Sequence, residues 1–187
     1  EISADAMDIS FPYKPQMTPE NQIYYDKYLS AWGFYCPFKE NYTEQSFAQD
    51  FRPYLLYYSS AAQEGKREEY DKLGVDIPAP IVEETVTRHF PVTAEQFRTS
   101  LPKNKNLMEY YDAEKNSYHF EGGYGGGSLS GVVTHAEQAG GLLKLSCDWY
   151  GMDDSFNFSH TVTIRLGQGE DAFYYMENTV TKQADAH

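Results

Sequence analysis

The stretch that decides the fold is FNFSHTVTIRL, residues 156–166. Apolar side chains and His160 occupy every second position, and polar side chains fill most positions between them. Because successive side chains of a β-strand point to opposite faces of a sheet, this alternation predicts a strand with one buried face and one solvated face. It is the clearest strand signal in the chain.

Neighbouring segments repeat the same period of two. They are residues 117–120, 129–135, 143–149 and 172–181. The later connections, EQAGG, GMDDS and GQGED, are short and rich in turn-forming residues, which favours tight reversals between antiparallel strands. We therefore expect residues 117–181 to form an antiparallel meander sheet of four to five strands.

The first half of the chain follows a helical period instead. Thr18, Pro19 and Glu20 form a helix start, after which apolar side chains recur every three or four residues up to Trp32. Similar spacing over residues 43–58 is interrupted by Pro53, which predicts a broken helix. Further helical segments are predicted at residues 61–73, 81–90 and 93–101, the last with a capping box formed by Thr93 and Gln96.

Helices followed by strands indicate the α+β class. We expect N-terminal helices packed on one face of a curved antiparallel sheet. The expected organisation is a tether over residues 1–19, a single domain over residues 20–182 (helical 20–101, sheet 117–181) and a tail over residues 183–187. The tether is inferred because residues 5–19 carry three prolines and little periodicity.

Two quoted stretches carry a family resemblance. FPVTAEQFR (90–98) and YYDAEKNSYHFEGGYGG (110–126), followed by four alternating strands, resemble small cystatin-like or nuclear-transport-factor-like domains in uncharacterised exported lipoproteins of gut Firmicutes. The resemblance covers about half of the chain. It implies a sheet bent around a pocket that helices cover, and a non-enzymatic role.

Charge and composition restrict the partners. The chain of 187 residues carries 15 Lys and Arg against 28 Asp and Glu, a net charge of −13. A surface of this sign repels nucleic-acid phosphates and anionic membranes, so we expect no nucleic-acid partner. No apolar run is long enough to span a bilayer. We expect an extracellular, cell-surface protein, with a lipid anchor upstream of residue 1 as one means of attachment, and a monomer or weak dimer.

The glycine-rich stretch after Phe120 matches no cofactor-binding loop. From Gly123 the sixth position is Ser128, which breaks the dinucleotide pattern, and Ser128 also stands where a phosphate-binding loop requires lysine. A strand follows, rather than a helix. We expect no cofactor and no metal, and we interpret the stretch as a bulged turn or as a flap over a pocket with Tyr124 at its tip.

Two cysteines, Cys36 and Cys147, are too few for a disulfide scaffold and lack metal-ligand spacing, although one bridge remains open. If the hairpin through GMDDS keeps both apolar faces on one side, Cys147 and His160 become neighbours across two strands. A histidine beside a cysteine can generate a nucleophilic thiolate. The alternative interpretation is that both side chains are core residues.

Tyrosine is in excess, with 17 residues, and ten of them occur up to Tyr70. Adjacent pairs such as Tyr57 and Tyr58 cannot share one helix face, so some rings are expected to be exposed or to line a groove while others pack in the core. Tyrosine offers a large, stiff surface with a polar tip, which suits peptide and sugar ligands.

The function expected from these patterns is non-catalytic binding of a small molecule, glycan or peptide in a pocket between helices and sheet. The alternatives are a cysteine-dependent enzyme that uses Cys147 with His160, and a purely structural protein-interaction module. The residues expected to line the pocket are Val86, His89, Tyr124, Trp149, His160 and Tyr175.

Overall fold

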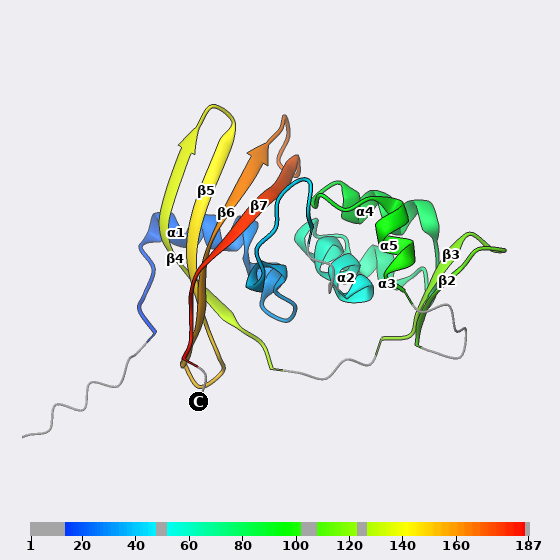
Figure 1. Ribbon diagram of the computed structural model, residues 1–187, viewed down its shortest axis with the longest axis horizontal. Helices are drawn as coiled ribbons and strands as arrows, with labels where there is room; N and C mark the ends of the chain where they lie inside the picture. The colour runs from blue at the N-terminus through cyan, green and yellow to red at the C-terminus, as the bar shows by residue number, and fades with distance from the viewer. Residues whose placement is uncertain (1–13, 48–51, 102–107, 123–126, 186–187) are drawn as a thin grey trace, which may run out of the picture.

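The computed structural model describes residues 14–47, 52–101, 108–122 and 127–185. Its largest element is a four-stranded antiparallel sheet in the order β4-β5-β6-β7, in which each strand pairs with the next one along the chain (Figure 1). The strands are β4 (Ser130–Ala139), β5 (Leu142–Tyr150), β6 (Phe156–Leu166) and β7 (Phe173–Gln183). The meander predicted from the period of two is confirmed.

The β4–β5 hairpin closes through the two residues Gly140 and Gly141, whose φ angles are 59° and 79°. Two-residue hairpin turns with positive φ at both positions twist in the same sense as the strands, and glycine adopts this conformation without a steric cost. The turn therefore fixes the register from Ala139 opposite Leu142 onward.

A bulge in β4 changes which side chains are buried. Val133 pairs with Cys147, but the next residue in register is His135, opposite Ser146. The extra residue, Thr134, reverses the alternation, so His135 is exposed while Val133 is buried. The sequence alternation had placed both side chains on one face.

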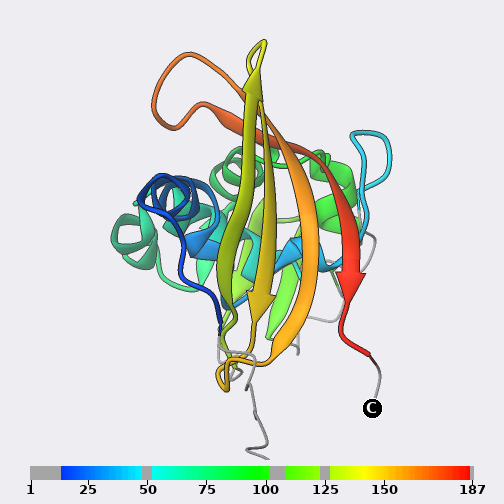
Figure 2. The same cartoon turned by 90° about the vertical axis from the view of Figure 1, so that its left-hand side faces the viewer.

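The N-terminal elements lie against this sheet. Helix α1 (Pro19–Tyr28) begins at Thr18, whose side chain accepts a hydrogen bond from the Asn21 backbone. Two short 3₁₀ turns follow, η1 (Ser30–Trp32) and η2 (Pro37–Lys39). Figure 2, turned by 90°, shows the four long strands in front of the helices, so the helices lie on one face of the sheet, as the sequence predicted.

The remaining helices form a second layer beside the sheet. They are α2 (Pro53–Gln63), α3 (Arg67–Asp71), α4 (Ala79–Thr87) and α5 (Ala94–Thr99). Pro53 begins α2 instead of bending a longer helix, because proline fits the first helical turn, where the N–H has no partner. The predicted helix over residues 61–73 is divided at Gly65, and the capping box of Thr93 and Gln96 is present.

A second sheet was not predicted. Strands β1 (Asp76–Pro78), β3 (Ser117–Phe120) and β2 (Glu109–Asp112) form an antiparallel sheet in the order β1-β3-β2. Residues 117–120 were expected in the meander, but Tyr118 packs edge-on against Phe97 of α5 and its hydroxyl donates to Glu83 of α4. These contacts hold β3 in the helical layer.

Aromatic rings fill the space between the helices and the large sheet. Trp32 lies edge-on to Phe90 and Tyr175, with ring centroids 5.1 and 5.7 Å apart, and its indole N–H donates to the Tyr175 hydroxyl over 3.1 Å. Such pairs contribute about 0.5–1.5 kcal/mol each beyond the area they bury. Within the described ranges, no helix has the length and apolar composition required to cross a membrane.

Candidate functional site

Five of the six residues expected to line a pocket lie in the core. Each of the five residues is 0 % exposed, and none of these residues borders the hollows described below. The five are Val86, His89, Trp149, His160 and Tyr175. The sixth, Tyr124, lies outside the described residues.

Cys147 and His160 are directly opposite each other in the β5–β6 register, so the predicted proximity is confirmed. Their chemistry is that of core residues. Burial raises the pKa of the Cys147 thiol well above its usual value and lowers the pKa of His160 to about 4, so both groups stay neutral at pH 7. The thiol contacts the Asp148 carbonyl, and the imidazole Nδ1 lies 2.7 Å from Asn178 Oδ1.

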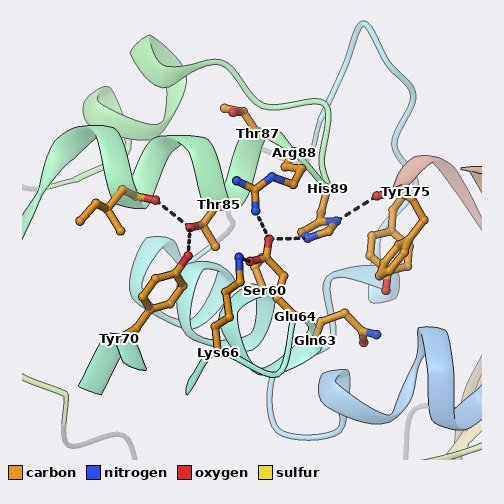
Figure 3. A network of polar contacts seen from close by, with 12 residues as sticks. Ser60, Gln63, Glu64, Lys66, Tyr70, Thr85, Thr87, Arg88, His89 and Tyr175 are labelled. Carbon is orange, nitrogen blue, oxygen red and sulfur yellow. Dashed lines mark hydrogen bonds and ion pairs between the residues drawn. The ribbon is translucent and has the colours of Figure 1, made fainter. Parts of the chain in front are cut away.

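His89 takes part in a buried polar network at the end of α2 (Figure 3). Its Nδ1 lies 2.9 Å from the Phe173 carbonyl and its Nε2 lies 2.9 Å from Glu64 Oε1. Both partners are acceptors, so each ring nitrogen of His89 faces an oxygen that can accept a hydrogen bond. The His89 carbonyl also accepts from the Tyr175 backbone N–H. The network thereby joins α2 and α4 to β7.

Glu64 is the negative centre of this network. Its side chain is 1 % exposed, and Arg88 Nη1 lies 2.5 Å from the oxygen that contacts His89. Burial alone would raise the pKa of Glu64, but hydrogen bonds from His89 and Arg88, together with their charges, lower it overall. The carboxylate therefore stays ionised at neutral pH and acts as a structural connection.

Two hollows of the described surface lie elsewhere, around α2. The larger of the two has a volume of about 470 Å³ and is lined mostly by apolar and hydroxyl-bearing side chains. Its lining is Ala31, Phe34, Tyr54, Tyr58, Ser59, Ala62 and Arg67.

A second hollow of about 230 Å³ adjoins the first, since Tyr54, Tyr58 and Arg67 border both. It lies between α2, α3 and the small sheet, and Tyr57, Tyr70, Phe120, Asp71 and Glu121 are among its other lining residues. We call the two together the tyrosine groove, with the larger hollow as its first arm and the smaller one as its second arm.

The rings of the tyrosine groove hold one another in place. Tyr54 and Tyr58, one turn apart on α2, are stacked with centroids 5.5 Å apart, and Tyr57 stacks on both Tyr70 and Phe120. Because each ring is restrained by a neighbour, the groove loses little side-chain entropy when a ligand binds.

The Tyr57 hydroxyl is the unusual polar group of the groove. Tyr57 is 2 % exposed, and its hydroxyl has no hydrogen-bond partner among the described residues. Burial, with the nearby Tyr70 and Asp71, raises the pKa of Tyr57, so the hydroxyl stays neutral and able to donate. A buried hydroxyl left without a partner costs about 1–3 kcal/mol.

A third hollow, of about 330 Å³, lies where the η1–η2 connection meets the start of β4. Cys36 borders it, but burial raises the pKa of this thiol to about 12, so it is a poor nucleophile. Both cysteines are free, and a bridge between them is not formed. In the described part of the chain, no three His, Cys, Asp or Glu side chains converge as metal ligands would.

The groove residues were only partly accessible to sequence reasoning. The tyrosine excess predicted that some rings line a groove, and Tyr58 does so beside the more deeply buried Tyr57. No sequence pattern identified Arg67 as a groove residue, because its position depends on how α3 turns back over α2 after Gly65. The helical spacing over residues 43–58 includes both Tyr54 and Tyr58 but does not indicate that they border a hollow.

The fold and the groove place the chain among α+β domains with a preformed surface hollow. The chain belongs to a family of unknown function, DUF6070, whose model matches residues 16–187. No curated protein and no solved structure matches the chain.

Proposed function

We propose that the protein is a non-catalytic extracellular domain which binds a small molecule, glycan or peptide in the tyrosine groove. The observation that carries the proposal is the Tyr57 hydroxyl, which is buried at a hollow and lacks a partner among the described residues. Polar groups of this kind, set among aromatic walls, orient ligands in preformed pockets. The groove lies between helices and the small sheet, instead of facing the meander.

Binding without catalysis is favoured by the chemistry of the groove. Burial raises the pKa of both Tyr54 and Tyr57, so neither hydroxyl supplies an anionic nucleophile near neutral pH. The enzyme alternative has weaker support, because Cys147 and His160 are both 0 % exposed and neutral. The extracellular placement rests on the proline-containing segment before Thr18, which we expect to act as a tether.

The test is a thermal-shift screen of oligosaccharides, short peptides and small organic molecules, followed by calorimetry on those that stabilise the protein. A ligand at about 100 times its Kd adds roughly 2.7 kcal/mol to stability. Tyr57→Phe keeps the ring and removes the hydroxyl, so the free protein should be as stable as wild type or more stable. Its affinity for the ligand should fall about tenfold, the effect of one hydrogen bond.

Tyr110→Phe is the matched control, since it makes the same change on β2 at a residue that does not line the groove. It should leave binding unchanged. Equal affinity of wild type and Tyr57→Phe for every ligand found would contradict the proposal, as would a screen without any stabilising compound.

A further inference from the structure

Arg67 differs from other arginines of the chain. Arg88, Arg98 and Arg165 each form an ion pair with a glutamate. Arg67 instead lies over the Tyr58 ring, with its guanidinium carbon 4.4 Å from the ring centroid. Among the described residues, no carboxylate lies within ion-pair distance of Arg67. In a chain with a net charge of −13, this leaves an arginine whose hydrogen-bond donors are available at the groove.

The surroundings of Arg67 are asymmetric along the groove. In the first arm it is the one charged residue of the lining, and Ala31, Phe34 and Ala62 provide apolar surface. Phe34 is 43 % exposed. The first arm therefore combines a single positive charge with an uncovered apolar wall.

The second arm has the opposite character. Asp71 and Glu121 line it together with Arg67. Two carboxylates repel an anion, so a negatively charged ligand group would avoid this arm and bind in the first. Tyr57 also lines the second arm, and its unpartnered hydroxyl would donate to a neutral acceptor of the same ligand.

We propose, on the basis of the function proposed above, that the first arm binds a carboxylate attached to an apolar or aromatic group. The guanidinium donates two parallel hydrogen bonds to the carboxylate, which is the geometry that arginine favours over lysine. The contact with the Tyr58 ring restrains the position of the guanidinium group. The apolar group lies against Phe34 and the two alanines.

Two sources present this chemistry: the carboxyl terminus of a peptide that ends in an apolar residue, and a small free carboxylic acid. The probes are N-acetyl-phenylalanine and the tripeptide Gly-Gly-Phe, each compared with its carboxamide. The amide keeps the shape and removes the charge. Calorimetry or ¹H–¹⁵N chemical-shift titration gives the affinities. We expect each acid to bind about tenfold more tightly than its amide, because hydrogen bonds to charged groups are roughly twice as strong as neutral ones.

Arg67→Gln should remove the preference for the acid, and Arg67→Lys should retain part of it. Lys72→Gln makes the same change of charge at the end of α3, outside the groove lining, and serves as the matched control. Added salt should weaken the acids more than the amides. Tighter binding of the tripeptide than of the amino acid would identify a peptide terminus as the source, and the reverse order would identify a small acid.

The outcomes separate this inference from the proposed function. Equal affinity of acid and amide, or an unchanged preference in Arg67→Gln, overturns the carboxylate assignment. If a neutral ligand still binds and is weakened by Tyr57→Phe, the groove remains a binding site. Absence of saturable binding by either acid up to about 10 mM also overturns the assignment, since even a weak pocket reaches a Kd near 1 mM. Circular dichroism of each variant establishes that it is folded.

Discussion

The buried imidazole of His160 makes a definite contribution to the dependence of stability on pH. The ring stacks on Phe38, whose centroid is 4.9 Å away and whose plane is nearly parallel, and it lies 6.2 Å from the Trp149 ring. Nδ1 lies 2.7 Å from Asn178 Oδ1, and Nε2 has no hydrogen-bond partner among the described residues. A second proton on Nε2 would therefore be a buried charge without an acceptor. Burial is the main reason that the pKa falls from 6.5 to about 4.

The sign and size of the effect follow from linkage. The unfolded state binds the proton at a higher pH than the folded state, so stability is lost as pH falls from about 6.5 towards 4. Each pKa unit corresponds to about 1.4 kcal/mol, which gives a full effect of about 3.4 kcal/mol. Of this, about 2 kcal/mol is lost between pH 7 and pH 5.

The assay is urea denaturation at pH 7 and pH 5, followed by tryptophan fluorescence, for wild type, His160→Gln and His135→Gln. The free energy of unfolding of wild type should fall by about 2 kcal/mol more than that of His160→Gln over this interval. His135→Gln should behave as wild type, because His135 is exposed. His119 contributes to the pH dependence of stability with the opposite sign, since hydrogen bonds to Asp76 and Glu121 outweigh desolvation and raise its pKa. This contribution is present in all three proteins and cancels in the comparison.

Equal losses in wild type and His160→Gln would refute the reasoning. A second measurement does not depend on the variant. The ring resonances of His160, followed by NMR in wild type, should show no titration above about pH 5. A midpoint near 6.5 would mean that the ring is solvated, contrary to the packing around it.

Three further predictions concern other parts of the fold. Glu64→Gln should lower the free energy of unfolding at pH 7, measured by urea denaturation, by about 1–3 kcal/mol, because it weakens the contacts to His89 and Arg88. This loss should shrink as pH falls through the lowered pKa of Glu64. Glu69→Gln, on the exposed surface of α3, should leave the free energy of unfolding unchanged. Gly131→Ala should cost about 1–3 kcal/mol of stability, because the added methyl would lie 2.7 Å from Tyr25 Cε2 and 2.8 Å from Cys147 Sγ; an unchanged midpoint would show that these neighbours move freely. Iodoacetamide should label Cys147 only in denaturant, because burial raises its pKa, and rapid labelling of the native protein would restore the enzyme alternative.

The meander could be predicted from sequence because a period of two is a local property. Strands β5 and β6 show their buried faces in the sequence without information about their partners, and turns such as Gly140-Gly141 mark the reversals. In β4 the bulge at Thr134 changes the buried face, which the alternation alone does not reveal. The small sheet could not be predicted in this way. Its strand β1 has three residues, 76–78, and pairs with β3 about forty residues later, so no local pattern identifies either its length or its partner.

The sequence predicted a pocket under the helices because the helices and the large sheet each have a buried face, and these two faces do meet. The space between them is filled by aromatic rings such as Trp32, Phe90 and Tyr175, so the side chains chosen as a lining are core residues. The volumes of side chains from three distant segments decide whether a hollow remains, and periodicity carries no information on this point. The tyrosine groove arises on the other side of α2, where the break at Gly65 brings α3 back beside Tyr58.

The hydrogen bonds that join Trp32 and Tyr28 to Tyr175 span 143 and 147 residues of sequence. A ribosome adds roughly 5–20 residues per second, so Tyr28 and Trp32 leave it about 7–30 s before Tyr175, to which both are hydrogen-bonded. During this interval both residues lack their contacts with β7, and native topology is completed only after nearly the whole chain has emerged. A chain that stops short of residue 173 would lack these partners and would keep that aromatic surface uncovered permanently.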